Sequence, residues 1–197
     1  MSINLVKGET INLSKEAAGS TNFELRAGWD TSYGISMDID TSVGEVGQDG
    51  NGVDFVYFGK MKSNDGALKL SGDNRTGEGN GWDETIYLDS TKISENVKII
   101  PAIVNIYAAK ERGQNFGLVR NLKVQIYDVT NDKVIADFIP ELEVGTSTAM
   151  LLGEFVVANG SMYFKPLGKG YDELRTILNE YKTVSYTHLT LPTTSRV

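Results

Sequence analysis

Residues 71–84, SGDNRTGEGNGWDE, combine the side chains that bind hard cations with a backbone that can fold around an ion. The stretch carries four carboxylates and three neutral oxygen donors: Asp73, Glu78, Asp83, Glu84, Asn74, Thr76 and Asn80. Its glycines allow the backbone to turn sharply and point carbonyl groups inward. Calcium takes 6 to 8 oxygen ligands in a tolerant geometry. The composition therefore fits a calcium site, and a solvated acidic surface loop is the alternative.

The spacing within this stretch excludes two better-known loops. An EF-hand loop beginning at Asp73 would need oxygen ligands at its third and fifth positions and glycine at its sixth, where Arg75, Gly77 and Glu78 stand. A phosphate-binding P-loop would need Lys followed by Ser or Thr after the last glycine, but Trp82 and Asp83 follow instead.

A second acidic pair lies in ISMDID, residues 35–40. The alternation predicts a strand over residues 35–39, with Asp38 and Asp40 on the face opposite the apolar side chains and about 6.6 Å apart along the chain. Like charges so placed are destabilising unless a positive group lies beside them. The pair is either a solvated face or part of the same cation site as residues 71–84.

The composition excludes several classes of chemistry. No cysteine occurs in the 197 residues, which rules out disulfides, zinc-thiolate sites, iron–sulfur clusters and thiol nucleophiles. The formal charge of −7 would repel a phosphate backbone, so nucleic acid is not an expected partner. No apolar run approaches the roughly 20 residues of a membrane-spanning helix, so direct membrane insertion is not expected either. The N-terminal sequence lacks the pattern of a secretory signal, and we expect a cytoplasmic location.

Short alternating runs separated by glycine, asparagine and aspartate predict an all-β fold, a β-sandwich of two mainly antiparallel sheets. We predict strands at residues 3–6, 10–13, 22–29, 35–39, 54–58, 68–71, 85–88, 97–108, 118–128, 134–138, 149–157 and 162–166. Asn159-Gly160 predicts a hairpin, because a type I′ turn needs positive φ at both central positions. Residues 171–182 carry an apolar stripe at helical spacing and predict a short C-terminal helix that covers a sheet.

The last residues, 184–197, differ from the rest of the chain. Their sequence, VSYTHLTLPTTSRV, resembles the translation of a sequencing-library adapter, and we predict a non-native tail, with disorder as the alternative. The only histidine, His188, lies in this tail. Residues 1–183 contain no linker, low-complexity block or internal repeat, so we predict that they form one domain. Because His188 lies outside this domain, histidine-based catalysis and metal ligation by histidine are not expected.

Five segments, in order, resemble the TerD family of bacterial tellurium-resistance and stress proteins. They are DFVYFGK (54–60), SGDNRTGEGNGWDE (71–84), RGQNFG (112–117), TAMLLGEF (148–155) and FKPLGKGY (164–171). The resemblance implies a β-sandwich that binds one or two Ca²⁺ ions. It places the metal ligands at Asp38, Asp40, Asp73, Asn74, Glu78, Asp83 and Glu84. The chain departs from the family pattern at Asn80 and Trp82, which replace acidic residues and put the second of two ions in doubt. It also departs at Ala108 and Ser147, where acidic residues are common in the family.

The family resemblance implies a stress-response or tellurite-resistance protein. No catalytic constellation emerges from the residues, so we expect this protein to act by binding rather than by catalysis. The expected partners are other tellurite-resistance and stress proteins, including membrane-associated ones. A metal-assisted enzyme and a receptor for nucleotides or other small ligands are the alternatives.

Two further motifs have alternative interpretations. RGQNFG is either a partner surface or support for the ion ligands, or a tight turn with Gly113 and Gly117 at positive φ and Phe116 packed below. DGNG, residues 49–52, is interpreted as a turn rather than as ion ligands.

Overall fold

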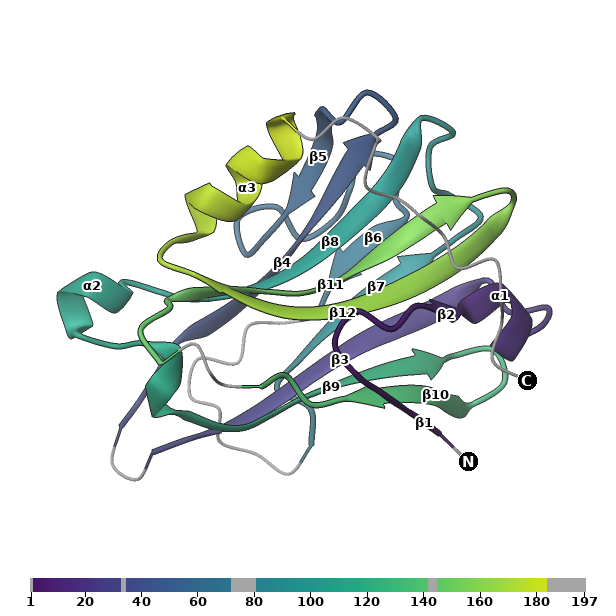
Figure 1. Ribbon diagram of the computed structural model, residues 1–197. Helices are drawn as coiled ribbons and strands as arrows, with labels where there is room; N and C mark the ends of the chain where they lie inside the picture. The colour runs from purple at the N-terminus through teal and green to yellow at the C-terminus, as the bar shows by residue number, and fades with distance from the viewer. Residues whose placement is uncertain (1, 33–34, 72–80, 142–144, 184–197) are drawn as a thin grey trace.

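Twelve strands form two six-stranded sheets in the computed structural model, which describes residues 2–32, 35–71, 81–141 and 145–183 (Figure 1). The first sheet has the spatial order β1 (Ile3–Leu5), β10 (Lys133–Phe138), β9 (Val119–Asp128), β3 (Asn22–Thr31), β7 (Glu84–Asp89), β6 (Leu68–Leu70). The second has the order β2 (Ile11–Asn12), β12 (Ser161–Tyr171), β11 (Ala149–Ala158), β8 (Val97–Ile106), β4 (Ile39–Gly47), β5 (Gly52–Val56). Neighbouring strands are antiparallel except for β1, which runs parallel to β10. The predicted sandwich is confirmed.

The inner faces of the two sheets form one continuous apolar core. On β3, Phe23, Leu25 and Ala27 alternate with more exposed residues, as expected of a strand with one buried face. In the second sheet, the rings of Phe155 and Phe164 pack with their centroids 5.0 Å apart. Each fully buried side chain of this size contributes roughly 1.5–3 kcal/mol through the hydrophobic effect.

The predicted hairpin joins β11 to β12. Asn159 and Gly160 have φ values of 51° and 71°, and Ala158 pairs directly with Ser161 on either side of them. The turn chemistry of this dipeptide was therefore sufficient to locate the connection.

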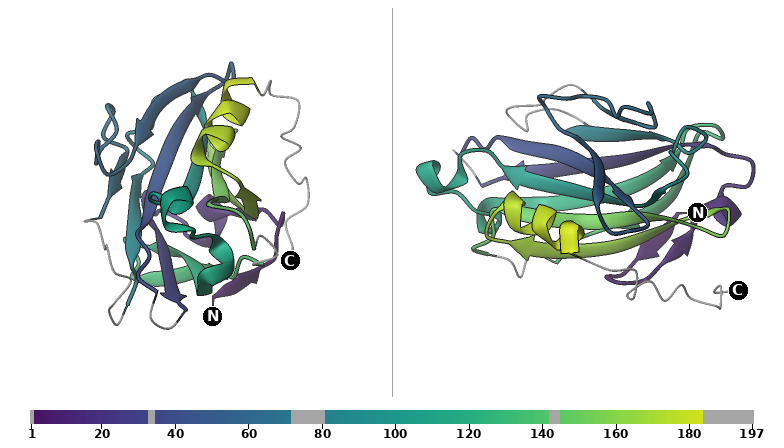
Figure 2. Two further views of the ribbon diagram at one scale, coloured as in Figure 1. Left: turned by 90° about the vertical axis from the view of Figure 1, so that its left-hand side faces the viewer. Right: turned by 90° about the horizontal axis from the view of Figure 1, so that it is seen from above.

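The predicted C-terminal helix is α3 (Leu174–Thr183), which lies along the outside of the second sheet (Figure 2). Ile177 and Tyr181 are buried against a small outer cluster that includes Val46 and Ile103. Tyr171, which we had placed on the helix, ends β12 instead.

Three short helical segments were not predicted: α1 (Leu13–Glu16), α2 (Ala109–Arg112) and the 3₁₀ turn η1 (Phe116–Leu118). They are too short to show a helical period in the sequence. No helix in the described part of the chain is both long and apolar enough to cross a membrane.

The strand predicted at residues 35–39 was misplaced, because β4 begins at Ile39 and continues to Gly47. Residues 35–38 are irregular, and the Ser36 carbonyl accepts a hydrogen bond from the Gln114 side chain rather than from a neighbouring strand. The predicted alternation of burial nevertheless holds, since Met37 and Ile39 are both buried.

Some predictions lie outside the described residues. Among them are the ligand candidates Asp73, Asn74 and Glu78, and the tail of residues 184–197 with His188. The division of the chain at residue 183 therefore stays a prediction.

Candidate cation site

Glu84 connects the two sheets. It begins β7 in the first sheet, is 7% exposed, and its Oε2 accepts a 2.8 Å hydrogen bond from the backbone N–H of Thr41 on β4 in the second sheet. Thr41 directly follows Asp40. The structure therefore brings Glu84 to the segment that carries Asp38 and Asp40, although the two are more than forty residues apart in the sequence.

Several buried oxygen atoms in this segment lack hydrogen-bond partners within the described residues. They are Oδ1 of Asp38, Oγ1 of Thr41 and Oγ of Ser42. A buried polar atom left unpaired costs about 1–3 kcal/mol. Asp38 is the most informative of the three, because a carboxylate oxygen can only accept a hydrogen bond or coordinate a cation. A buried carboxylate oxygen without a donor fits coordination to a hard cation such as Ca²⁺.

Asp83 directly precedes β7 and contacts strand β3 rather than β4. Its Oδ2 accepts a 2.8 Å hydrogen bond from the Trp29 N–H, and its own N–H donates to the Ala27 carbonyl at 3.0 Å. Burial raises the pKa of Asp83; the Asp30 charge adds to the effect, while the Trp29 N–H and the charge of Lys123 oppose it. A nearby cation would favour the ionised form of this carboxyl group.

Trp82, which replaces an acidic residue of the family pattern, packs between a glycine and a lysine. A Cβ on Gly28 would lie 2.9 Å from Lys123 Cε and 3.3 Å from the Trp82 ring, so a side chain at that position would crowd both groups. The Lys123 ammonium lies 4.9 Å from the centre of the ring, in a cation–π contact. Trp82 is thus held in place next to Asp83.

RGQNFG forms a tight turn and also supports the Asp38 segment. The Gln114 Nε2 donates to the Ser36 carbonyl at 2.8 Å, two residues before Asp38. The Asn115 Oδ1 accepts from the Gly117 N–H at 2.9 Å, and Phe116 is fully buried.

The glycines of this turn have different roles. Gly113 has a φ of 61°, as predicted, but the prediction of a positive φ at Gly117 is wrong. Gly117 is required for space instead, because a Cβ there would lie 2.7 Å from the Gly145 carbonyl oxygen.

The turn interpretation of residues 49–52 is confirmed. The Asp49 carboxylate accepts hydrogen bonds from the Asn51 N–H at 3.0 Å and from the Asn51 side chain at 2.7 Å, and Gly50 has a φ of 79°. Asp54 lies on β5 and forms an ion pair with Lys60.

Within the described residues, no three acidic or histidine side chains are arranged so that they could hold a metal ion by themselves. Three of the seven predicted ligands belong to residues 72–80, outside that description. Of the other four, Asp38, Asp40 and Glu84 belong to the joined segments, and Asp83 contacts β3.

The comparison with known proteins decides the family. A model of the TerD domain matches residues 1–181. The chain belongs to the TerD family. It is 34% identical to a tellurium resistance protein TerD from an Alcaligenes species over 176 residues, which cover 87% of this chain and 92% of the relative. It is 33% identical to general stress protein 16U of Bacillus subtilis (strain 168) over 178 residues, which cover 87% of this chain and 92% of that relative.

The fold of this TerD-family chain is also found in a crystal structure. A telluride resistance protein (TerD) homologue from Streptomyces coelicolor A3(2) superposes with a TM-score of 0.66 at 24% identity, over 81% of this chain and 95% of that one. The family thus includes tellurium resistance and general stress proteins, and the sandwich is shared with a solved relative.

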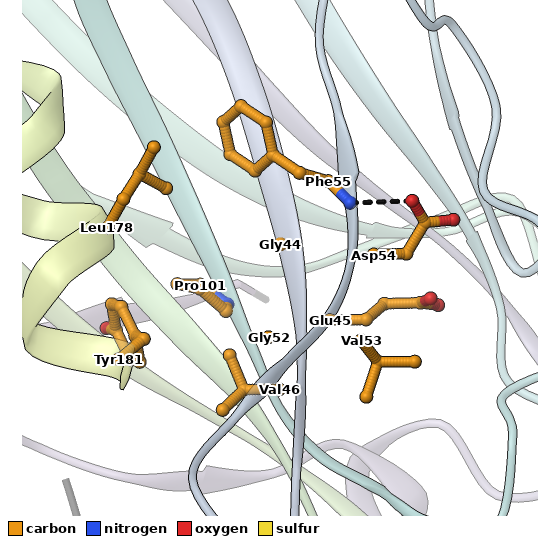
Figure 3. Close-up of a pocket in the computed structure, with 10 residues that line it drawn as sticks. All are labelled: Gly44, Glu45, Val46, Gly52, Val53, Asp54, Phe55, Pro101, Leu178 and Tyr181. Carbon is orange, nitrogen blue, oxygen red and sulfur yellow. Dashed lines mark hydrogen bonds between the residues drawn. The ribbon is translucent and has the colours of Figure 1, made fainter. Parts of the chain in front are cut away.

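A pocket of about 330 Å³ lies on the outer side of the second sheet, between α3 and the edge formed by β4 and β5 (Figure 3). Its apolar walls include Val46, Phe55, Pro101, Leu178 and Tyr181. The sequence reasoning missed this pocket. The only signal for it was the apolar stripe of α3, which shows that the helix covers a sheet but not how completely.

Proposed function

We propose that this protein is a Ca²⁺-binding stress-response protein of the tellurite-resistance type, which works in the cytoplasm by binding partners rather than by catalysis. The observation that carries the proposal is the buried Oδ1 of Asp38, which has no hydrogen-bond donor among the described residues. Asp38 lies three residues before Thr41, whose N–H binds Glu84 of the other sheet. The names of the relatives support the connection to tellurium resistance and stress.

The ion ligands would come from two parts of the chain. In the proposal, Asp38, Asp40 and Glu84 supply carboxylates from the two segments that the Thr41–Glu84 hydrogen bond joins, and residues 72–80 supply Asp73, Asn74 and Glu78. Bound Ca²⁺ supplies positive charge to a set of oxygen ligands. Two carboxylates about 4 Å apart repel by roughly 4 kcal/mol at an effective dielectric constant of 20, so this charge stabilises their close approach.

The chain's own residues fix the position of these carboxylates. Gln114 holds the Ser36 carbonyl, Tyr107 donates its N–H to the Asp38 carbonyl at 2.8 Å, and Trp29 donates to Asp83. We propose that ordering of residues 72–80 against this frame creates the surface that binds other tellurite-resistance and stress proteins. Asp83 adds negative charge from the β3 side.

A calcium titration followed by the melting temperature tests the proposal. A ligand that binds only the folded protein raises its stability, so we expect the melting temperature to rise with Ca²⁺ from micromolar to millimolar concentrations. Asp38→Asn should remove most of this rise, while Glu95→Gln, which neutralises an exposed carboxylate elsewhere, should not. An unchanged melting temperature of the wild-type protein at millimolar Ca²⁺ would refute the proposal.

A further inference from the structure

A separate group of carboxylates lies at the free edge of the second sheet. Glu45 on β4 is paired directly with Asp54 on β5, and Figure 3 shows both side chains pointing away from α3. Glu45 is only 2% exposed, and its Oε1 has no hydrogen-bond partner within the described residues. The Glu45 carboxyl also lies within hydrogen-bonding reach of the Asp65 carboxyl, in the connection between β5 and β6. A buried carboxyl group thus faces two others.

Asp65 is held in its ionised form by hydrogen-bond donors. It accepts from the Ser63 hydroxyl at 2.7 Å, from the Ala67 N–H at 2.8 Å, and from the N–H and hydroxyl of Ser94 at 2.9 and 3.1 Å. Burial alone would raise the pKa of Asp65, but these donors outweigh it and lower the pKa below its ordinary value.

Asp54 is ionised for a similar reason. It forms an ion pair with Lys60 and accepts hydrogen bonds from the N–H groups of Asn64 and Phe55, both at 2.7 Å. These interactions lower the pKa of Asp54 despite its burial. Glu45 therefore faces two negative charges from two different segments.

Glu45 differs from both neighbours because its buried Oε1 has no donor among the residues that the structure describes. Burial raises the pKa of Glu45 to about 7, with further contributions from the charges of Asp65 and Asp54 and from its hydrogen bond with Asp65, while the Lys60 ammonium opposes the shift. These are the charged groups that face Glu45 from β5 and from the connection that follows it.

We propose that Glu45 is a proton-binding site that couples the packing of β5 and the following connection to pH. In its neutral form, Glu45 takes one proton from solvent and donates it in a hydrogen bond to the Asp65 carboxylate. In its ionised form, Glu45 repels Asp54 and Asp65, which loosens the sheet edge. The same connection carries the exposed rings of Tyr57 and Phe58, so the proton also controls how firmly this aromatic surface is held.

The direction of the effect follows from the pKa. The ordinary pKa of the carboxyl is 4.5 and the folded value is about 7, so between these values the folded protein holds a proton that the unfolded chain has released. The contribution of Glu45 to stability is therefore fully present below pH 4.5 and is lost as the pH rises through about 7.

An NMR titration of the wild-type protein without calcium tests the proposal directly. The side-chain carboxyl ¹³C shift of Glu45 should titrate with a midpoint near pH 7, and the backbone amide signals of β5 should shift with the same midpoint. A Glu45 midpoint below about pH 5 would overturn the proposal, because that is the range of an unperturbed glutamate.

Urea unfolding between pH 5 and pH 8 provides the second test. The unfolding equilibrium constant of the wild-type protein should increase by up to about tenfold per pH unit between pH 5 and 7 through this one proton. Glu45→Gln, which is neutral at every pH, should lack this increment, and the control Glu95→Gln should keep it. The same pH dependence in Glu45→Gln as in the wild type would contradict the proposal. These measurements are made without calcium, so their outcome is independent of the proposed cation site.

Discussion

At the level of single residues, Glu84 has two roles that substitutions can separate. Its carboxylate accepts the Thr41 N–H, and it is also a proposed ion ligand. Glu84→Ala leaves a buried N–H without its acceptor, so we expect the free energy of unfolding without calcium to fall by about 1–3 kcal/mol. Glu84→Gln keeps an acceptor oxygen but removes the charge.

Glu84→Gln should therefore lose much less stability than Glu84→Ala in the absence of calcium. It should still lose part of the calcium-induced rise in melting temperature. Urea unfolding with and without Ca²⁺ measures both quantities. Equal loss of stability in the two variants without calcium would show that the Thr41 contact is not the reason for the burial of Glu84.

Ala108 adopts a backbone conformation that suits other residue types. Its φ is 50°, and the other described non-glycine residues with positive φ are Asn121, Asp132 and Asn159. Asparagine and aspartate tolerate this region far better than alanine. Ala108→Asn should raise the free energy of unfolding by about 0.5–1 kcal/mol, because it relieves strain where β8 joins α2.

Ala108→Val provides the matched comparison for this prediction, since a β-branched residue is the least suited to positive φ. It should lower the free energy of unfolding measured by urea. A loss of stability in Ala108→Asn would mean that contacts of the side chain, rather than the backbone conformation, determine the choice of residue at this position.

The sequence indicated candidate ligands for the cation site but not the contacts that surround them. Asp38, Asp40 and Glu84 could be chosen because carboxylates cluster there, and the structure brings their segments together. The bond from Thr41 to Glu84 and the support of the Ser36 carbonyl by Gln114 could not be foreseen. Both join segments that are far apart in the chain, and no local pattern records such a contact.

At the level of elements, α3 is attached to its sheet by both apolar packing and tyrosine hydroxyl groups. Tyr181 donates to Glu154 Oε1 and Tyr171 donates to Glu180 Oε2, each at 2.6 Å. Tyr181→Phe keeps the ring in the apolar cluster but removes one donor. The free energy of unfolding should fall by about 1 kcal/mol, since hydrogen bonds to charged groups contribute roughly this much or more.

Hydrogen exchange can locate this effect in the structure. In Tyr181→Phe the amides of α3 should exchange faster, while those of β3 and β9 should keep the protection of the wild type after correction for global stability. Tyr87→Phe, which changes a tyrosine on β7 in the other sheet, is the control. Unchanged exchange in α3 would show that apolar packing alone holds the helix.

The strands show which patterns can be recognised in the sequence. The β11–β12 hairpin was predicted because Asn159-Gly160 specifies its turn locally. Most of β4 was missed because its sequence, IDTSVGEVG, buries Thr41, Ser42 and Glu45, which are polar types that do not predict a buried strand. Their burial depends on the neighbouring strands and on the Glu84 contact rather than on an alternation within β4.

At the level of the whole molecule, opposite shifts of carboxyl pKa values predict where stability is highest. Burial would raise the pKa values of Asp54, Asp65 and Asp128, but hydrogen bonds outweigh it and lower them. The contribution of these three carboxylates to stability is therefore present above their ordinary pKa of 3.8. It is lost as the pH falls through the lower pKa values of the folded protein. Glu45 has the opposite shift, to about 7, and its contribution is lost as the pH rises. The formal net charge of −7 also makes the folded chain repel itself more as the last carboxyl groups ionise.

We therefore expect the free energy of unfolding without calcium to be highest on the acid side of neutrality, between about pH 4 and pH 6. Urea unfolding at a series of pH values from 3 to 9 measures the curve, and Glu45→Gln should flatten only its upper side, because the groups that cause the loss at low pH are unchanged. A wild-type curve that keeps rising from pH 5 to pH 8 would contradict the prediction. It would mean that the carboxylates stabilised by donors, and not the buried Glu45, dominate the response of the whole fold to protons.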